Sequence, residues 1–185
     1  SKHRLSAQTV LWYCTDFLIK AIAPFLSFTA EQAYASFNDG TDSESVFLTR
    51  WPDYRRFRNQ EFESEFGRLM GMREYVYKAM EEKRAAGEIG SSLEAHVTVT
   101  VSDDAEYELL SRRTEELTEI FIVSSVSIEK GPVRQVTVVR AEGDKCPRCW
   151  NVRADVGSDQ QFNEVCGRCA EALRDLERPR ATPDV

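Results

Sequence analysis

Apolar residues at helical spacing predict a long first helix over residues 5–25. Two rows recur at that spacing, one through Leu11, Cys14, Leu18 and Phe25, the other through Val10, Tyr13 and Phe17. A helix that is apolar on two sides is usually surrounded by neighbours. We therefore expect Cys14 to be a small core residue and Pro24 to end or kink the helix.

Two further helices follow in the pattern. Thr29 with Gln32 three residues later resembles a capping box, which predicts a short helix ending at Phe37, followed by a loop over residues 38–43. A second long helix is expected from Asn59 to Gly87. Its apolar stripe comprises Phe62, Phe66, Leu69, Met70, Val76, Tyr77 and Met80. The two long helices are expected to form an antiparallel hairpin, half of a larger bundle.

The period changes after Gly90. Residues 95–101 alternate between apolar and polar, which predicts a half-buried strand. Residues 103–118 have the spacing of a helix, and residues 121–129 and 133–140 have the pattern of strands. A short helix is expected over residues 170–177, and the tail 178–185 is expected to be disordered. The fold class is therefore α+β: a helical domain over 1–90, a strand-helix-strand-strand module over 91–142 and a cysteine-rich region over 143–177.

Charge restricts the classes of partner. The chain of 185 residues has a formal net charge of −7, which argues against a protein that coats DNA through a basic surface. A local arginine cluster with aromatic residues can still recognise RNA on an acidic body. No signal peptide or membrane span is evident in the sequence. Because the first residue is Ser1, we expect a fragment of a longer protein.

Four of the five cysteines form two close pairs, Cys146-Pro147-Arg148-Cys149 and Cys166-Gly167-Arg168-Cys169, with sixteen residues between the pairs. Two residues between cysteines form a tight turn that aims both thiolates at one ion, and two such turns complete a tetrahedron. Four thiolates leave no position for water, so this pattern predicts one structural zinc ion. An odd cysteine count without a signal peptide also fits a reducing cytoplasm better than a disulfide framework.

Two other uses of such cysteines are a redox dithiol and an iron–sulfur cluster. A redox dithiol normally occurs once, at the start of a helix, whereas this motif occurs twice. Ligation of an iron–sulfur cluster by four cysteines is not excluded by residue type. Zinc remains the favoured ion, and the polar segment between the pairs should fold only when the metal is bound.

Trp150 directly follows the second cysteine and has two interpretations. Its indole could cover the thiolates, or it could be a platform for an unstacked base, with Arg148 and Arg153 contacting phosphates. Arg168 has the matching position in the other cysteine pair. From chemistry alone the two interpretations are equal.

Other candidate sites are weak. Arg50, Arg55, Arg56 and Arg58 surround Trp51 with only Asp53 opposing them; they could touch a nucleic-acid backbone or form a solvated helix start. No phosphate-binding loop, nucleophile–base pair or carboxylate pair is evident, so no catalytic residue is assigned.

The sequence resembles the carboxy-terminal end of bacterial isoleucyl-tRNA synthetases. The matching stretches, in the order of that family, are 23–33 (APFLSFTAEQA), 44–52 (ESVFLTRWP), 89–95 (IGSSLEA), 121–124 (FIVS), 145–150 (KCPRCW) and 166–169 (CGRC). The zinc knuckle with its following Trp is the most discriminating of these, and it is more distantly similar to the zinc finger of certain DNA glycosylases.

The resemblance implies an ATP-dependent ligase that joins isoleucine to its tRNA in the cytoplasm. Residues 1–90 would be part of the anticodon-binding domain, 91–142 a junction and 143–177 the zinc-binding domain. The catalytic signatures of the family are absent from these residues, so the fragment should be inactive alone. The resemblance also favours RNA contacts by Trp150, Arg148, Arg153 and Arg168. The alternative is a stand-alone zinc-ribbon protein that binds nucleic acid or a protein partner.

A bare apolar strip on the first helix would also be expected if its bundle partners lie elsewhere. Such strips usually find a partner. We therefore expect the isolated chain to self-associate through Val10, Tyr13 and Phe17.

Overall fold

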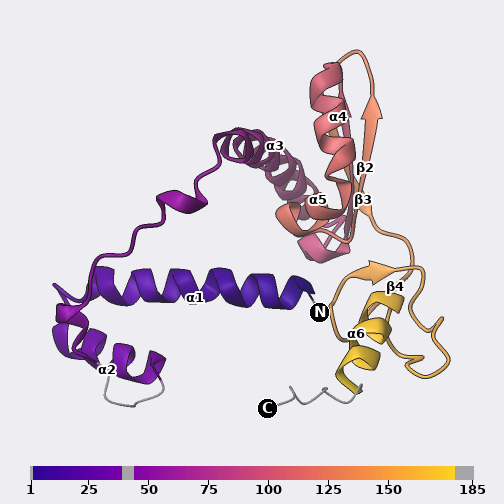
Figure 1. Ribbon diagram of the computed structural model, residues 1–185. Coiled ribbons are helices and arrows are strands. Elements are labelled where there is room, and N and C mark those ends of the chain that lie inside the picture. The colour runs from indigo at the N-terminus through magenta and orange to yellow at the C-terminus, as the bar shows by residue number, and fades with distance from the viewer. Residues whose placement is uncertain (1, 39–43, 178–185) are drawn as a thin grey trace. The chain divides into compact units, whose positions relative to one another are not determined.

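The computed structural model describes residues 2–38 and 44–177, which fall into two compact units divided between Arg58 and Asn59 (Figure 1). The fold is mixed α+β, as predicted. The expected loop after Asn38 and the expected disordered tail lie outside the described residues. Among the described helices, none combines the length and the apolar character needed to cross a membrane.

The first unit is built on α1 (Lys2–Ile22) and α2 (Ser27–Phe37). Its small core consists of Ile19, Ala23, Ala30 and Val46. After the undescribed residues the chain runs through two single 3-10 turns, η1 (Val46–Leu48) and η2 (Arg55–Phe57). The Glu31 carboxylate on α2 accepts hydrogen bonds from the Ser45 hydroxyl and the Val46 backbone N–H, both at 3.1 Å, which holds η1 against α2.

Two predictions for this unit were wrong. Helix α2 begins at Ser27 without a side-chain cap, so Thr29 lies inside the helix and the predicted capping box does not form. Cys14 is exposed instead of buried. The reason is that α1 packs on α2 through Ile19 and Ala23, and its row through Leu11 and Leu18 stays exposed.

The second unit begins with α3 (Gln60–Ala85), which starts and ends close to the predicted bounds. The Asn59 side chain accepts a hydrogen bond from the Phe62 N–H at 3.0 Å and so caps the helix. After Ala85 the chain turns at Gly87, whose φ of +73° favours glycine. The buried stripe of α3 is Leu69, Met72, Val76 and Met80, while the predicted Phe62 and Phe66 are exposed.

A three-stranded sheet follows the turn η3 (Ser92–Glu94), in the order β2-β1-β3. Strand β1 (Ala95–Val101) pairs in parallel with β2 (Ser125–Lys130) and antiparallel with β3 (Gln135–Arg140). Its apolar residues are all fully buried and alternate with half-buried polar ones, as the pattern predicted. Helix α3 and the helices between β1 and β2 supply the rest of this core.

The predicted single helix over 103–118 is two helices, α4 (Asp104–Arg112) and α5 (Thr114–Phe121). Arg113, with φ −110° and ψ 17°, leaves the helical conformation between them. The break lets Leu110 on one helix and Leu117 on the other both reach the core. Helix α5 continues to Phe121, where a strand was predicted, and Ile122 ends it in the left-handed conformation.

The predicted domain boundary at residue 90 remains a prediction of the sequence. In the structure α3 shares one core with the sheet and is therefore part of the second unit. Because α1 and α3 belong to different units, the predicted hairpin of long helices also stays a prediction.

Candidate metal centre

The cysteine pairs lie at the ends of short secondary-structure elements. Cys146 follows β4 (Asp144–Lys145), which pairs with β5 (Val152–Arg153) to form a small hairpin around the first cysteine pair. Cys166 directly precedes α6 (Gly167–Glu177), and Cys169 lies in its first turn. The four sulfur atoms all lie within 4.8 Å of one another.

The spacing of the sulfur atoms fits tetrahedral zinc. With Zn–S bonds of ~2.3 Å, each edge of a tetrahedron of sulfurs is about 3.8 Å long. The Cys149 and Cys166 sulfurs are 3.8 Å apart. A disulfide would need about 2 Å, and all five cysteines are free thiols. Four sulfur donors with no fifth group among the described residues form a closed site for a structural ion.

Backbone hydrogen bonds hold the first cysteine pair in shape. The Cys146 N–H donates to the Asn151 carbonyl at 2.9 Å, and the Trp150 N–H donates to the Cys146 carbonyl at 2.8 Å. Gly143, with φ +109°, allows the hairpin to close, because a Cβ there would lie 2.4 Å from the Arg153 carbonyl oxygen.

The second pair is tied to the first and to the loop between them. The Cys166 N–H points at the Cys146 sulfur at 3.4 Å. The Gly167 N–H, at the start of α6, donates to the Asp155 carboxylate at 3.0 Å. Nothing in the local sequence indicates this role for Asp155, which lies far from the helix that it caps.

The thiols differ in their readiness to ionise. Burial opposes ionisation of Cys146, but backbone N–H groups of Cys149, Cys166 and Arg148 outweigh it and lower the pKa of Cys146 to about 6. Burial and the neighbouring thiols raise the pKa of Cys166 to about 12. Burial also raises the pKa of Cys149. Four adjacent thiolates repel one another, and a divalent cation bound between them offsets this repulsion.

The apolar cluster around the sulfurs is very small. Apart from the cysteines, its buried members are Val165 and Ala170, with Val156, Phe162 and Leu173 packed against them. These side chains shield the thiolates, and the sequence pattern did not single them out. Burial of so few apolar side chains cannot offset the conformational entropy lost when about thirty residues become ordered, so folding of this part requires the metal.

Trp150 does not take part in that shielding. Its side chain is 62% exposed and it is absent from the cluster around the sulfurs. Its backbone has φ +66°, a left-handed conformation that costs a residue with a Cβ about 1–2 kcal/mol. The hydrogen bond to the Cys146 carbonyl holds it there. The metal knuckle therefore presents a large aromatic ring to solvent.

The three arginines named with Trp150 differ in their surroundings. Arg148 is exposed, and its guanidinium lies 3.5 Å from the Cys169 sulfur, where it offsets thiolate charge. Arg168 lies 3.8 Å from the Glu119 carboxylate on α5. Arg153 is half-buried, and its Nε has no hydrogen-bond partner among the described residues. All three lie in the zinc-binding part of the chain. Arg148 and Arg168 already have partners, the Cys169 sulfur and the Glu119 carboxylate.

One buried side chain joins the metal hairpin to the sheet. The Ser124 hydroxyl, just before β2, accepts a hydrogen bond from the Val152 N–H on β5 at 2.7 Å and donates to the Leu93 carbonyl at 2.5 Å. Ser124 is almost fully buried, so the zinc knuckle has a fixed anchor on the α+β module.

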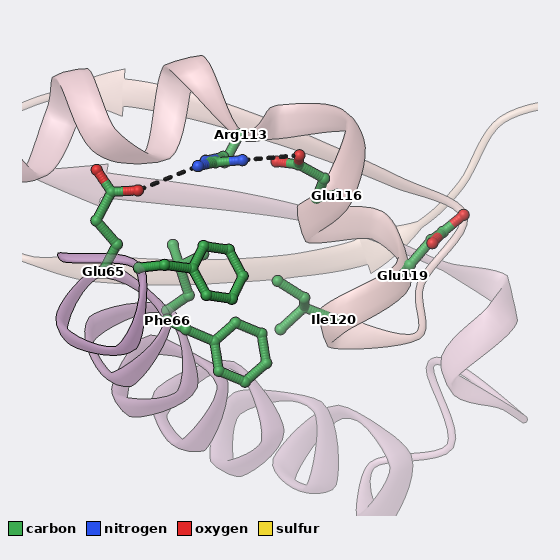
Figure 2. Close-up of a pocket in the computed structure, with 8 residues that line it drawn as sticks. Glu65, Phe66, Arg113, Glu116, Glu119 and Ile120 are labelled. Atoms are coloured by element: carbon green, nitrogen blue, oxygen red, sulfur yellow. Dashed lines mark hydrogen bonds and ion pairs between the residues drawn. The ribbon is translucent and has the colours of Figure 1, made fainter. Parts of the chain in front are cut away.

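A separate groove of 330 Å³ lies between α3 and α5 (Figure 2). Its floor includes the stacked rings of Phe62 and Phe66. Arg113 bridges Glu65 and Glu116 across it, with N–O distances of 3.1 and 3.0 Å (Figure 2). Those ion pairs, first of all the one with Glu116, raise the pKa of Arg113.

Fold and site together define a class: a mixed α+β protein that carries a four-cysteine zinc-finger site. Comparison with known families agrees. Residues 1–99 match the family described as the anticodon-binding domain of tRNA ligase. Residues 143–172 match the zinc finger found in FPG and IleRS. The chain belongs to the family of anticodon-binding domains of tRNA ligases, and its four-cysteine cluster is a site for one structural zinc ion.

The curated relatives carry the name isoleucine–tRNA ligase. That of Fervidobacterium nodosum is 41% identical over 182 residues, which is 94% of this chain and 20% of that ligase. That of Petrotoga mobilis is 37% identical over 183 residues, covering 95% of this chain and 20% of the ligase. That of Dichelobacter nodosus is 39% identical over 170 residues, covering 91% and 18%. The chain thus spans about a fifth of the length of these relatives.

Proposed function

We propose that this chain binds the anticodon arm of an isoleucine tRNA as the carboxy-terminal part of an isoleucine–tRNA ligase. ATP use and the joining of isoleucine to tRNA would belong to the remainder of that ligase, and the whole would work in the reducing cytoplasm, where free thiols persist. The observation that carries the proposal is Trp150. Its exposed ring is fixed next to the zinc ligand Cys149, on a chain whose first half is an anticodon-binding domain.

The proposed mechanism is recognition by a rigid surface. The zinc ion would hold the two cysteine turns, and the Cys146 carbonyl would hold the Trp150 backbone. The indole would then stack on an unpaired base without losing much conformational entropy on binding, and the exposed Arg148 would contact a phosphate. Arg153 and Arg168 would add charge at the edge of this surface. Catalytic residues are not assigned to the chain.

The Trp150→Ala variant tests this proposal. Stacking on an aromatic ring is worth about 1–3 kcal/mol per base, so affinity for isoleucine tRNA should fall roughly 5- to 150-fold. Trp150→Phe should recover most of the affinity, because a ring remains. Phe28→Ala is the matched control, since Phe28 is also an exposed aromatic ring but lies on α2, outside both candidate RNA sites. Filter binding would measure both, with a non-cognate tRNA in parallel. Unchanged affinity in Trp150→Ala, or equal wild-type affinity for both tRNAs, would contradict the proposal.

We also propose that the isolated chain self-associates through α1. Of the residues named from the sequence, Val10 is exposed, whereas Tyr13 and Phe17 contact the aromatic rings of the segment 51–57. The exposed Leu11 and Leu18 extend the bare strip. Light scattering should show a mass that rises with concentration, and the Leu11→Glu variant should reduce it. A monomer at every concentration would contradict this.

A further inference from the structure

A second cluster of arginines and aromatic rings lies in the first unit, where the segment 50–58 packs on α1. Tyr13 is 4.9 Å from Phe57 and 5.8 Å from Tyr54, measured between ring centroids, and Phe17 is 5.7 Å from Trp51. We name Tyr13, Phe17, Trp51, Tyr54, Arg56 and Phe57 the arginine–aromatic platform.

The platform has a fixed base. The Tyr54 hydroxyl is shared between the Tyr13 carbonyl at 3.0 Å and the Asp16 carboxylate at 3.2 Å. Asp16 is buried and forms a 2.7 Å ion pair with Lys20. Burial and the nearby Asp16 raise the pKa of Tyr54, so its hydroxyl stays a donor at neutral pH. The segment is therefore attached to α1 by buried polar contacts as well as by rings.

Arg56 lies over two rings of the platform. Its guanidinium carbon lies 4.7 Å from the Phe57 ring centroid and 5.7 Å from that of Tyr13. One N–H donates to the Tyr13 hydroxyl at 3.2 Å. A guanidinium has five N–H donors in a planar fork, and among the described residues only the Tyr13 hydroxyl accepts from Arg56, so most of its donors remain for a ligand.

The charge around the platform is positive although the chain is acidic. Residues 50–58 contain four arginines and one acidic residue, Asp53, in a chain whose net charge is −7. Asp53 is occupied by Arg55 at 2.7 Å, and this hydrogen bond holds the pKa of Asp53 below its usual value. Asp16, which accepts from the Tyr54 hydroxyl, is paired with Lys20. A polyanion therefore meets local attraction here.

The exposed rings distinguish RNA from other polyanions. Trp51 is 63% exposed and Phe57 is 54% exposed, which places flat apolar surface directly beside the arginines. Acidic proteins would use the charge but not the ring faces. Unpaired bases use both, because they stack on rings while their phosphates meet arginine.

We propose that the arginine–aromatic platform is a second RNA-contact site, with Arg56 on a phosphate and Trp51 on an unstacked base. It rests on the proposed function, since the RNA is the tRNA that the zinc knuckle would bind. Both sites, one in each unit of the chain, would then bind the same tRNA. The affinity of the whole chain for tRNA would therefore exceed that of either site alone.

The test measures binding of the zinc-loaded chain to an isoleucine tRNA over a range of salt concentrations. Arg56→Gln should lower the affinity about 3- to 30-fold and reduce the slope of log affinity against log salt by about 0.7–0.9, the value of one phosphate contact. Arg56→Lys should keep the slope but lose part of the affinity, because charge remains without the planar fork. Trp51→Ala should lower the affinity at least about 5-fold with the slope unchanged. Circular dichroism of each variant checks that α1 and α2 are intact.

The control is Arg84→Gln, which removes an exposed arginine from the end of α3 in the other unit. It should leave both affinity and slope at the wild-type values. If wild type binds while Arg56→Gln and Trp51→Ala bind as tightly with the same slope, the platform is not an RNA site and the zinc-knuckle proposal stands. An equal loss of tRNA affinity in Arg84→Gln would also contradict the platform as an RNA site. So would equal losses of affinity when the platform variants bind duplex DNA of the same length. Failure of the wild type to bind any tRNA would overturn the proposed function itself.

Discussion

Replacing Cys166 by Ser is expected to unfold residues 143–177 while leaving the three-stranded sheet folded. Cys166 is fully buried and is one of the four members of the sulfur cluster, so serine removes one of four ligands without a substitute. Structural zinc contributes roughly 10–16 kcal/mol to the folding of small finger peptides, far more than the few apolar residues around these sulfurs can replace. The sheet has its own core on α3, α4 and α5 and does not depend on the ion.

Elemental analysis and amide hydrogen exchange would check this result. The variant should lose stoichiometric zinc, and protection should disappear from α6 but persist in β1. Cys14→Ser is the matched control, because Cys14 is an exposed thiol on α1 outside the cluster. It should keep zinc and protection at wild-type values. Zinc retained in Cys166→Ser, with α6 still protected, would contradict the assignment of this ligand.

The second large effect is expected from Phe121→Ala. Phe121 is fully buried at the end of α5, where it lies in the same cluster as Leu117, Val97 and Val76. Removing a buried phenyl ring typically costs about 3–5 kcal/mol, from lost transfer free energy and the cavity left behind. Unfolding of the second unit should therefore shift to a much lower urea concentration.

Urea denaturation followed by far-ultraviolet circular dichroism would measure the shift. Phe28→Ala provides the contrast, because Phe28 is 94% exposed on α2 and should change stability by less than about 0.5 kcal/mol. A loss below about 1 kcal/mol in Phe121→Ala would mean that the ring does not fill the core as the structure shows.

The sequence predicted best those elements whose signals are local. Strand β1 has strict alternation of valine and polar residues, and its predicted bounds were confirmed. Asn59 caps α3 at the predicted start because an N-cap is a contact between residues three apart. The zinc site has the same character, since two short turns with fixed spacing contain all four ligands.

The failures occurred where tertiary contacts decide the outcome. The apolar stretch Phe121-Ile122-Val123 makes a strand a reasonable expectation, but Phe121 still belongs to α5, and the left-handed Ile122 moves the start of the strand from 121 to 125. The capping box at Thr29 was overridden because α2 begins earlier, directly after the turn at Pro24. Cys14 was expected in a core because periodicity shows that a row is apolar but does not show what covers it.

Side-chain partners across long separations were also invisible in the sequence. Arg148 was selected as a phosphate contact, and the structure places its guanidinium beside the Cys169 sulfur. The sequence of the segment 50–58 indicates only a solvated helix start or a contact with a nucleic-acid backbone. Its packing on Tyr13 and Phe17 involves the Tyr54–Asp16 hydrogen bond, between residues 38 positions apart. No local pattern encodes such a pair.

One zinc ion bound by four cysteines would hold the turn that presents Trp150. X-ray absorption at the zinc edge of the purified chain tests this most directly. The four-cysteine site predicts one zinc ion per chain with four sulfur neighbours at ~2.3 Å and no oxygen or nitrogen ligand. A spectrum with oxygen or nitrogen in the coordination shell, or a chain that holds no stoichiometric zinc, would contradict it.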